Sequence, residues 1–307
     1  MKTNKIFISA FAIAIAMASA TSCGSDDDNS LPPIGGYDNA DQVAETDLVA
    51  YWPLNGNGKE KISNTSPSSS VGTTYDVGIK GQGAKMTNGY MKYPSIASLT
   101  TSMNAFTISA WVKVKNNQTL TTGSVSVFFS LSRPDDWEGN INMYAETGQK
   151  PAIEASGAAN DTIIFKESFR SSVSGGEGYA NFPRLEPWMI DDNMVTPGKH
   201  VAGPNVVGST VTWAHALVTW DGATNKLIIY SNGAKISSPA FEVRGSNTSI
   251  VFDTPTTPVI GAFGNVDTTS DTWNKPMTGS LDEIRVWKKA LTPAEIGSLY
   301  ELEKAGR

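Results

Sequence analysis

The chain has 307 residues, with 24 Lys and Arg against 30 Asp and Glu, and a single cysteine. Its formal net charge of −6 at pH 7 argues against binding to nucleic acid or to an anionic membrane surface, and one cysteine excludes an intrachain disulfide. Neutral glycans or a protein partner suit this charge better.

Residues 1–22 have the pattern of an export signal. MKTNK carries two positive charges, IFISAFAIAIAM is an apolar run too short to cross a membrane, and small residues lead to Cys23. A solitary cysteine at this place resembles a bacterial lipobox, although Ala20 stands where Leu is more usual. The resemblance implies lipid modification of Cys23, and an ordinary signal peptide with an unmodified cysteine stays the alternative.

The residues after Cys23 predict a flexible tether over 23–46. The segment GSDDDNSLPPIGGYDNADQ is acidic and contains Pro and Gly, so it has little to bury and is expected to stay solvated. Three aspartates so close to the cysteine resemble the surface-export signal of Bacteroides-type lipoproteins. That resemblance implies a lipid anchor in the outer membrane with the following domain exposed at the cell surface. A linker facing the periplasm is the alternative.

From residue 47 onward, short apolar or alternating runs between Gly, Asn, Asp, Ser and Pro predict β-strands. The predicted strands are 48–54, 89–94, 106–114, 124–131, 141–146, 162–169, 215–221, 226–232, 257–263 and 281–287. One helix is expected after them, because Thr292 can cap it and Pro293 suits its first position. This pattern predicts an all-β domain over 47–307, an antiparallel two-sheet jelly-roll β-sandwich with a short C-terminal helix.

The order of these segments resembles that of laminin-G-like jelly-roll domains, in the concanavalin A-like lectin/glucanase superfamily. The resemblance covers about 47–132 and 209–302, and its most specific part is GSLDEIRVW followed by ALTPAEI. It implies a jelly roll in which the first and last strands are neighbours. Residues 133–208 are longer than the corresponding part of such domains and predict an insertion at one edge or face, with loops of a length that is usually functional.

The carboxylate of Asp282 needs an explanation. Strict alternation in LDEIRVW places Ile284 and Val286 on the apolar face and puts Asp282 there too, where an unpaired charge is costly to bury. Many members of the superfamily hold a structural calcium between an early loop and the last strand, and the resemblance implies Asp282, Asn55 and Gly56 as its ligands. The alternative is that backbone N–H groups at the strand entry compensate Asp282 without a metal.

No familiar catalytic constellation occurs in the sequence. It has no G-x-S-x-G, no H-E-x-x-H and no E-x-D-x-x-E, the spacing that gives the superfamily's glucanases their paired carboxylates. His215 lies in a predicted strand and is expected to pack there, while Glu283 beside Arg285 predicts a salt bridge on the outer face. A glycoside hydrolase or polysaccharide lyase with an unfamiliar site within 133–208 stays open as an alternative.

Aromatic residues in loops are the candidate ligand-binding residues, because sugar rings stack on exposed Trp and Tyr while polar side chains bind their hydroxyl groups. The candidates are Trp137, Tyr179, Trp188 and Trp273. For each of them the alternative is a hydrophobic contact that holds a loop in place.

We therefore expect a surface-anchored, non-catalytic, lectin-like lipoprotein that binds a polysaccharide or oligosaccharide. Its further partners would be the proteins of a glycan-uptake system at the outer membrane. An adhesion module that binds protein is the second alternative.

Overall fold

The computed structural model describes residues 31–134, 136–137, 139–148, 156–157, 161–170, 178–181, 206–207, 211–237, 239–243 and 250–307. The export signal and Cys23 lie outside these residues. The unit Pro33–Arg307 contains all the elements described below. In the described part of the chain, no helix is both long and apolar enough to span a membrane.

Antiparallel strands make up most of the regular structure of this unit. The strands are β1 (Leu48–Trp52), β2 (Ser69–Val77), β3 (Gln82–Lys92), β4 (Ala105–Lys113), β5 (Ser126–Ser132), β6 (Ile141–Glu146), β7 (Thr162–Arg170), β8 (Gly178–Asn181), β9 (Val206–Val207), β10 (Ala214–Asp221), β11 (Lys226–Ser231), β12 (Ala234–Lys235), β13 (Thr257–Ile260) and β14 (Met277–Trp287). The helices are α2 (Pro239–Glu242), α3 (Pro293–Lys304) and the 3₁₀ turns η1 (Ala40–Gln42), η2 (Glu45–Asp47) and η3 (Ala97–Leu99).

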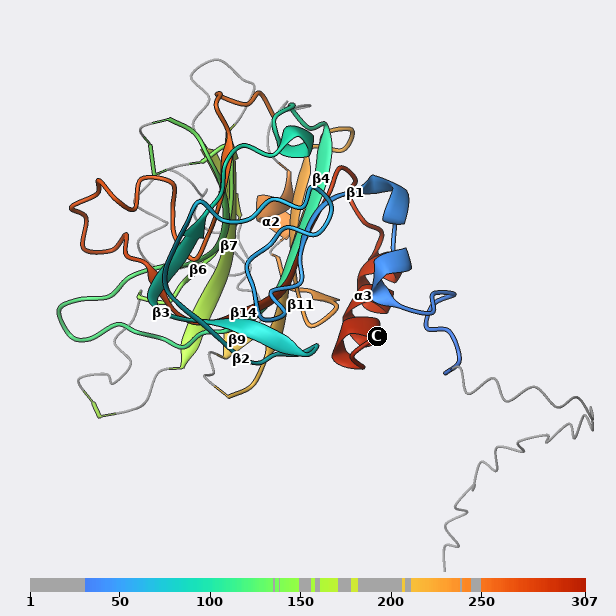
Figure 1. Cartoon of the computed structure of the whole chain (residues 1–307), viewed down its shortest axis with the longest axis horizontal. Coiled ribbons are helices and arrows are strands. Elements are labelled where there is room, and N and C mark those ends of the chain that lie inside the picture. The colour runs from blue at the N-terminus through green and yellow to red at the C-terminus, as the bar shows by residue number, and fades with distance from the viewer. Residues whose placement is uncertain are drawn as a thin grey trace, which may run out of the picture. The chain divides into compact units, whose positions relative to one another are not determined.

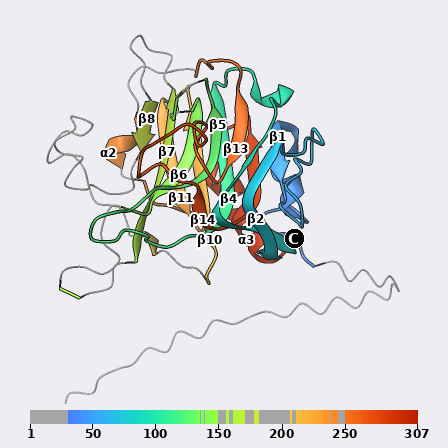
Figure 2. The ribbon, with the colours of Figure 1, turned by 60° about the vertical axis from the view of Figure 1, so that its left-hand side comes forward.

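The strands form one antiparallel ladder that curls into two facing layers. Its order is β12-β11-β10-β4-β14-β3-β13-β5-β6-β7-β8, with β1 paired to β14, β2 to β3 and β9 to β7. The ring of Phe169 in β7 lies 6.4 Å from that of Phe106 in β4 and 4.6 Å from that of Trp220 in β10. Strands far apart in the ladder therefore face each other across the core, with β6 and β7 opposite β4 and β11 (Figures 1 and 2). The predicted all-β jelly-roll sandwich is confirmed.

Sequence alternation explains most of these elements. In β4, Phe106, Ile108, Ala110 and Val112 are fully or almost fully buried in the core, as a period of two requires. Helix α3 begins where the sequence predicts, with Thr292 and Glu295 forming a reciprocal capping box. Strand β2 was not predicted, because its residues are mostly polar and exposed; among the described strands it pairs with β3 alone.

The segment 133–208 builds part of the sandwich as well as carrying loops. Its strands β6, β7 and β8 continue the ladder beyond β5 to one edge of the sheet. Phe165 and Phe169 of β7 are buried in the main core. Ile141 and Met143 of β6 are buried in the same core, so β6 and β7 are part of the folded domain and not an appendage to it.

The predicted extension of the flexible tether to residue 46 is wrong. The folded unit begins at Pro33, and Ala40 and Val43 are buried against Trp287 and the apolar side of α3. The indole N–H of Trp287 donates to the Val43 carbonyl at 3.1 Å. The composition of the segment did not predict this contact, because it is acidic overall. Two small apolar residues, Ala40 and Val43, are enough to pack against Trp287 and α3.

The face assigned to Asp282 from alternation is also wrong. Between Asp282 and Arg285 the pairing of β14 with β4 shifts register, and Glu283 has a φ of +49°. This β-bulge adds one residue to the strand, so Leu281 joins Ile284 and Val286 in the main core. Asp282 consequently lies outside that core, although it is fully buried.

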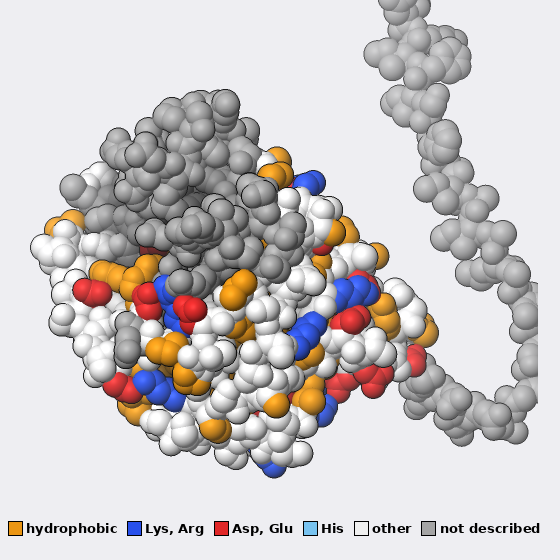
Figure 3. All heavy atoms as spheres, turned by 90° about the horizontal axis from the view of Figure 1, so that it is seen from above, with side chains coloured by type: hydrophobic (Ala, Val, Ile, Leu, Met, Phe, Trp, Pro, Cys, Tyr) orange, Lys and Arg blue, Asp and Glu red, His pale blue; other side chains and the backbone are white. Residues whose placement is uncertain are grey.

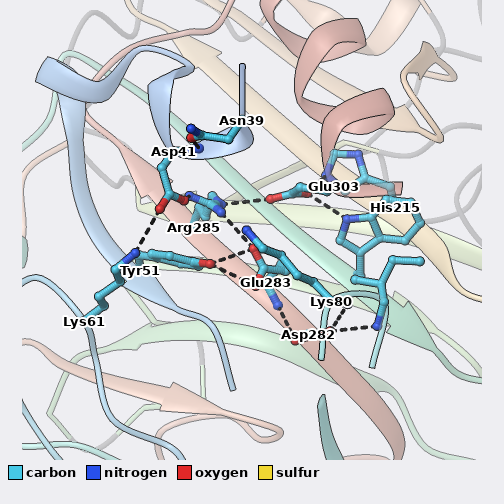
Figure 4. Close-up of polar contacts among 12 residues, drawn as sticks. Asn39, Asp41, Tyr51, Lys61, Lys80, His215, Asp282, Glu283, Arg285 and Glu303 are labelled. Carbon is cyan, nitrogen blue, oxygen red and sulfur yellow. Dashed lines mark hydrogen bonds and ion pairs between the residues drawn. The ribbon is translucent and has the colours of Figure 1, made fainter. Parts of the chain in front are cut away.

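A buried ion network on the outer side of β14 joins three parts of the chain (Figure 4). The guanidinium of Arg285, fully buried, donates to Glu303 of α3, to Glu283 of β14 and to Asp41 of η1, each at 2.8 Å. The same guanidinium lies 3.7 Å from the centroid of the Tyr51 ring, and the Tyr51 hydroxyl donates to Glu283 at 2.7 Å. The salt bridge expected between Glu283 and Arg285 is confirmed, but it is buried under η1 and α3.

Replacing Arg285 by Met should lower the free energy of unfolding by about 3–5 kcal/mol, because Glu283 and Glu303 would stay buried without their cation. Urea denaturation measures this change. The control is Lys304→Met, whose exposed ammonium group lies 3.9 Å from Glu301 and should matter by less than about 1 kcal/mol. Equal stability of the two variants would contradict the role given to Arg285.

Candidate functional site

Two of the four candidate aromatic residues lie in one pocket. Trp137, from the loop between β5 and β6, meets Trp273, from the loop before β14, with ring centroids 5.2 Å apart and planes at 89°. The residues that line this aromatic pocket are Val125, Trp137, Tyr144, Glu146, Lys166 and Trp273, and its volume is about 170 Å³. Trp273 exposes 36% of its surface, so an aromatic ring is open to solvent at the rim.

A small hydrophobic cluster supports the two tryptophans. Phe263 is fully buried beneath them, 5.3 Å from Trp137 and 6.1 Å from Trp273, and it also contacts Tyr144 at 5.4 Å. All of these ring pairs are steeply inclined, the arrangement that the aromatic quadrupole favours. The rings of Tyr144, Phe263 and Trp137 form with Val125 and Val127 a cluster separate from the main core, and Trp273 contacts its Phe263. The tryptophans are therefore held in place before any ligand arrives.

Backbone and polar contacts fix the two loops that carry the tryptophans. The Val125 N–H donates to the Trp273 carbonyl at 3.0 Å, and the Asn274 amide donates to Asn265 at 2.9 Å. On the other side, Arg133 pairs with Asp136, next to Trp137, and with Asp253. These contacts limit the cost of ordering the loops on binding.

An ion pair supplies the polar part of the pocket. Lys166 of β7 donates to Glu146 of β6 at 2.6 Å, with about 8% and 9% of the two side chains exposed. The ammonium group also lies 5.1 Å from the centroid of the Tyr144 ring. Burial alone would lower the pKa of Lys166, but Tyr144 and Glu146 raise it, so the lysine carries a charge. The pair offers charged donor and acceptor groups beside the aromatic rings.

Sequence reasoning did not identify Glu146 and Lys166. A signal was present: Tyr144 and Glu146 share one face of the predicted strand 141–146, and Lys166 interrupts the apolar strand 162–169. In the structure Tyr144 is directly opposite Lys166. That register could not be read from either strand alone.

The other two aromatic candidates, Tyr179 and Trp188, are not among the described residues that line the aromatic pocket. Tyr179 lies in β8, where its backbone pairs with Phe169, and its side chain is outside the described residues. Trp188 lies entirely outside the described residues.

The predicted calcium ligands meet at the turn between β2 and β3. Asp282 accepts the N–H groups of Ile79 at 2.8 Å and Lys80 at 3.2 Å on one oxygen, and that of Glu283 at 3.0 Å on the other (Figure 4). The side-chain oxygen of Asn55 accepts the Gln82 N–H at 3.1 Å.

These contacts correspond to the metal-free alternative, in which backbone donors compensate the carboxylate. Gly56, next to Asn55, has a φ of +76°, and a side chain there would meet Gln82. Within the described ranges, no group of three or more His, Cys, Asp or Glu is placed to hold a metal ion. Ca²⁺ needs six to eight oxygen ligands, and the Asp282 and Asn55 oxygens already accept N–H groups, so the residues fit a calcium poorly. The resemblance and these contacts therefore give opposite expectations for a calcium ion, and removal of calcium distinguishes them.

His215 packs in the core of the outer network, as expected. It is fully buried, with its ring 5.1 Å from Trp111 and 5.9 Å from Tyr300. Burial and the positive charge of Arg285 lower its pKa to about 3. The imidazole is therefore neutral at physiological pH, and its position away from the aromatic pocket gives it no part in the candidate site.

The fold is a jelly roll of the lectin type. Residues 85–297 match the family model described as the concanavalin A-like lectin/glucanases superfamily, and the chain belongs to that superfamily. A search among curated proteins gave no match.

Several solved toxin structures share the fold. The binding domain of Paraclostridial Mosquitocidal Protein 1 has a TM-score of 0.55 and 15% identity, over 84% of this chain and 52% of that one. The binding domain of botulinum neurotoxin serotype G has a TM-score of 0.53 and 14% identity, over 83% and 51%. A structure of botulinum neurotoxin type C, whose cell entry depends on two ganglioside molecules, has a TM-score of 0.51 and 12% identity, over 86% and 53%. The present chain thus spans about half the length of these solved chains, and the likeness concerns the fold.

Removing calcium should leave the melting temperature unchanged, because backbone donors already satisfy Asp282. Thermal unfolding with added CaCl₂ and with EDTA measures this. A rise in melting temperature with calcium that the variant Asp282→Asn abolishes would instead support the calcium site.

Titration of Asp282 should lower the stability of the protein as the pH rises from about 4 to about 8, while the buried, neutral His215 acts in the opposite direction up to its ordinary pKa of 6.5. Burial and the nearby charge of Glu283 raise the pKa of Asp282 from an ordinary 3.8 to about 8, against the opposite effect of its backbone donors. In that window the folded state holds a proton that the unfolded state has lost, so unfolding becomes easier with each pH step. Burial raises the pKa of Glu303 as well, which acts in the same direction.

The variant Asp282→Asn tests this effect, because it cannot titrate. Its free energy of unfolding, measured in urea between pH 5 and 8, should increase relative to that of the wild type as the pH rises, because the wild type alone loses the contribution of Asp282. Parallel pH profiles for the two proteins would contradict the assignment, whatever their absolute stabilities.

Proposed function

We propose that this protein binds carbohydrate in the aromatic pocket and does not cleave it. The observation that carries the proposal is the pair of perpendicular tryptophans, Trp137 and Trp273, beside the buried ion pair of Glu146 and Lys166. The C–H face of a sugar ring stacks on an indole, while its hydroxyl groups donate to a carboxylate and accept from an ammonium group. The pocket offers both kinds of contact within one small space.

Membership of a superfamily of lectins and glucanases supports this proposal, although fold alone does not fix function. The dependence of the type C neurotoxin on ganglioside, a glycolipid, is in line with it. Because the match covers about half of that toxin chain, its ligand supports the proposal only by analogy.

The arrangement of charges favours binding over hydrolysis. Glycoside hydrolysis commonly needs two carboxyl groups on either side of the scissile bond. Glu146 is the one carboxylate among the described residues that line the pocket, and it is already paired with Lys166. A hydrolase would need a second acid, and the residues described around the pocket do not supply it.

The proposal includes an anchor. Lipid modification of Cys23, inferred from the sequence, would attach the protein to the outer membrane with the jelly roll exposed at the cell surface. A surface glycan-binding lipoprotein would pass its ligand to the proteins of an uptake system. Mass spectrometry of the mature N-terminus tests the lipid anchor independently of ligand binding.

Trp273→Ala should weaken binding of the purified protein to its glycan at least tenfold, a loss typical of an exposed aromatic anchor. The measurement is a polysaccharide panel by affinity electrophoresis, followed by calorimetry on the best ligand. Its control is Trp213→Ala, which removes a partly buried tryptophan stacked under Lys113 outside the pocket.

Trp273→Phe should retain part of the affinity, because it keeps an aromatic face. Equal losses for Trp273→Ala and Trp213→Ala would contradict the proposed site. Failure of the folded wild-type protein to bind any glycan would favour the protein-binding alternative, and release of reducing ends would favour an enzyme.

A further inference from the structure

A second depression lies beside the aromatic pocket, and we call it the polar groove. Its volume is about 280 Å³. The residues that line it are Asn88, Asn117, Thr122, Gly123, Ser124, Thr272, Lys275, Pro276 and Thr278. Except for Lys275, all of these side chains are neutral, and most of them carry hydroxyl or amide groups. The groove therefore offers many hydrogen-bonding groups and one positive charge, with no carboxylate among its described lining residues.

Most of the polar wall is held rigid by its own hydrogen bonds. The amide of Asn117 donates to Ser124 at 3.3 Å and to Thr147 at 3.1 Å, and its oxygen accepts the Ser124 N–H at 3.0 Å. On the opposite wall the Asn88 N–H donates to the Thr278 hydroxyl at 3.0 Å. A wall fixed in this way loses little conformational freedom when a ligand binds.

Lys275 is the available cation of the groove. Its side chain is exposed, and within the described ranges no carboxylate lies at ion-pair distance from it. By contrast, Lys166 in the neighbouring pocket is already paired with Glu146. An incoming anion would thus meet Lys275 without displacing an internal partner.

The polar groove and the aromatic pocket share a wall. Thr272 and Ser124 line the groove, whereas the next residues in each segment, Trp273 and Val125, line the pocket. The hydrogen bond from the Val125 N–H to the Trp273 carbonyl joins the two segments. A chain of sugar units that stacks on Trp273 would continue directly over this wall into the groove.

We propose that the polar groove is a second subsite that takes an anionic sugar unit, a uronate or a sulfate ester, with its anionic group on Lys275. This inference rests on the proposed glycan-binding function and adds the class of glycan. Neutral hydroxyl and amide groups of the groove would bind the remaining oxygens of the unit.

The net charge of the protein would not attract an anionic glycan from a distance, so its recognition must depend on contacts within the groove. The chain is acidic overall, and acidic and basic side chains lie side by side on the face shown in Figure 3. A short-range contact with Lys275 is therefore the discriminating interaction, and it should weaken with added salt because the ammonium group is exposed.

The test compares glycans that differ only in charge. The probes are polygalacturonate against its methyl ester, and dextran sulfate against dextran, each with the purified full-length protein at low and high salt. Lys275→Gln should weaken binding of the charged member of the preferred pair about tenfold, and leave the neutral member unchanged. The matched control is Lys226→Gln, which removes the same charge from an exposed position at the start of β11 that does not line the groove.

The outcomes separate this inference from the proposed function. Preference for polygalacturonate identifies a uronate, preference for dextran sulfate identifies a sulfate ester, and loss of either preference in Lys275→Gln supports the subsite. Equal losses in Lys275→Gln and Lys226→Gln, or equal binding of charged and neutral probes, overturn it. If neutral glycans then still require Trp273, the proposed function stands without the second subsite; if no glycan binds at all, the proposed function itself fails.

Discussion

The buried guanidinium of Arg285 is the interaction on which the outer side of the fold depends. A buried positive charge is costly unless opposite charges pair with it, and here carboxylates from η1, β14 and α3 each accept a hydrogen bond from a different nitrogen of the guanidinium. Burial tends to raise the pKa of Asp41, but Arg285 and Lys61 lower it to about 2, so this carboxylate stays ionised through the physiological range. The network therefore holds the first and last segments of the folded unit onto the same strand.

The bulge in β14 makes that network compatible with an apolar core. The added residue allows Leu281 and Ile284 to face the core while Asp282, Glu283 and Arg285 lie outside it. The left-handed conformation of Glu283 costs of order 1–3 kcal/mol, and its bonds to Tyr51 and Arg285 offset that cost. The network and the bulge stabilise the layer that contains β14. The aromatic pocket lies on the other layer, which contains β5 to β7.

The sequence predicts the fold well and the site only in part. Alternation identified most strands, and cap residues identified α3, because these signals are local. The sequence also pointed to Trp137 and Trp273, since aromatic residues in Gly- and Asp-rich loops are unusual. It could not show that they touch, because that contact depends on how two distant loops fold over Phe263. The bulge at Glu283 was missed because strict alternation assumes that no residue is added to a strand. In addition, Glu is not a residue type that indicates a positive φ.

The most direct test of the central claim is ¹⁹F NMR of protein labelled with 5-fluorotryptophan and titrated with its best-binding glycan. The chain has eight tryptophans, so the spectrum reports on every candidate tryptophan at once. Resonances are assigned with Trp137→Phe and Trp273→Phe. The account predicts that the signals of Trp137 and Trp273 shift together on binding, while those of the core residues Trp52 and Trp220 stay fixed. Saturable binding that leaves both pocket signals unmoved would place the glycan elsewhere and contradict the account.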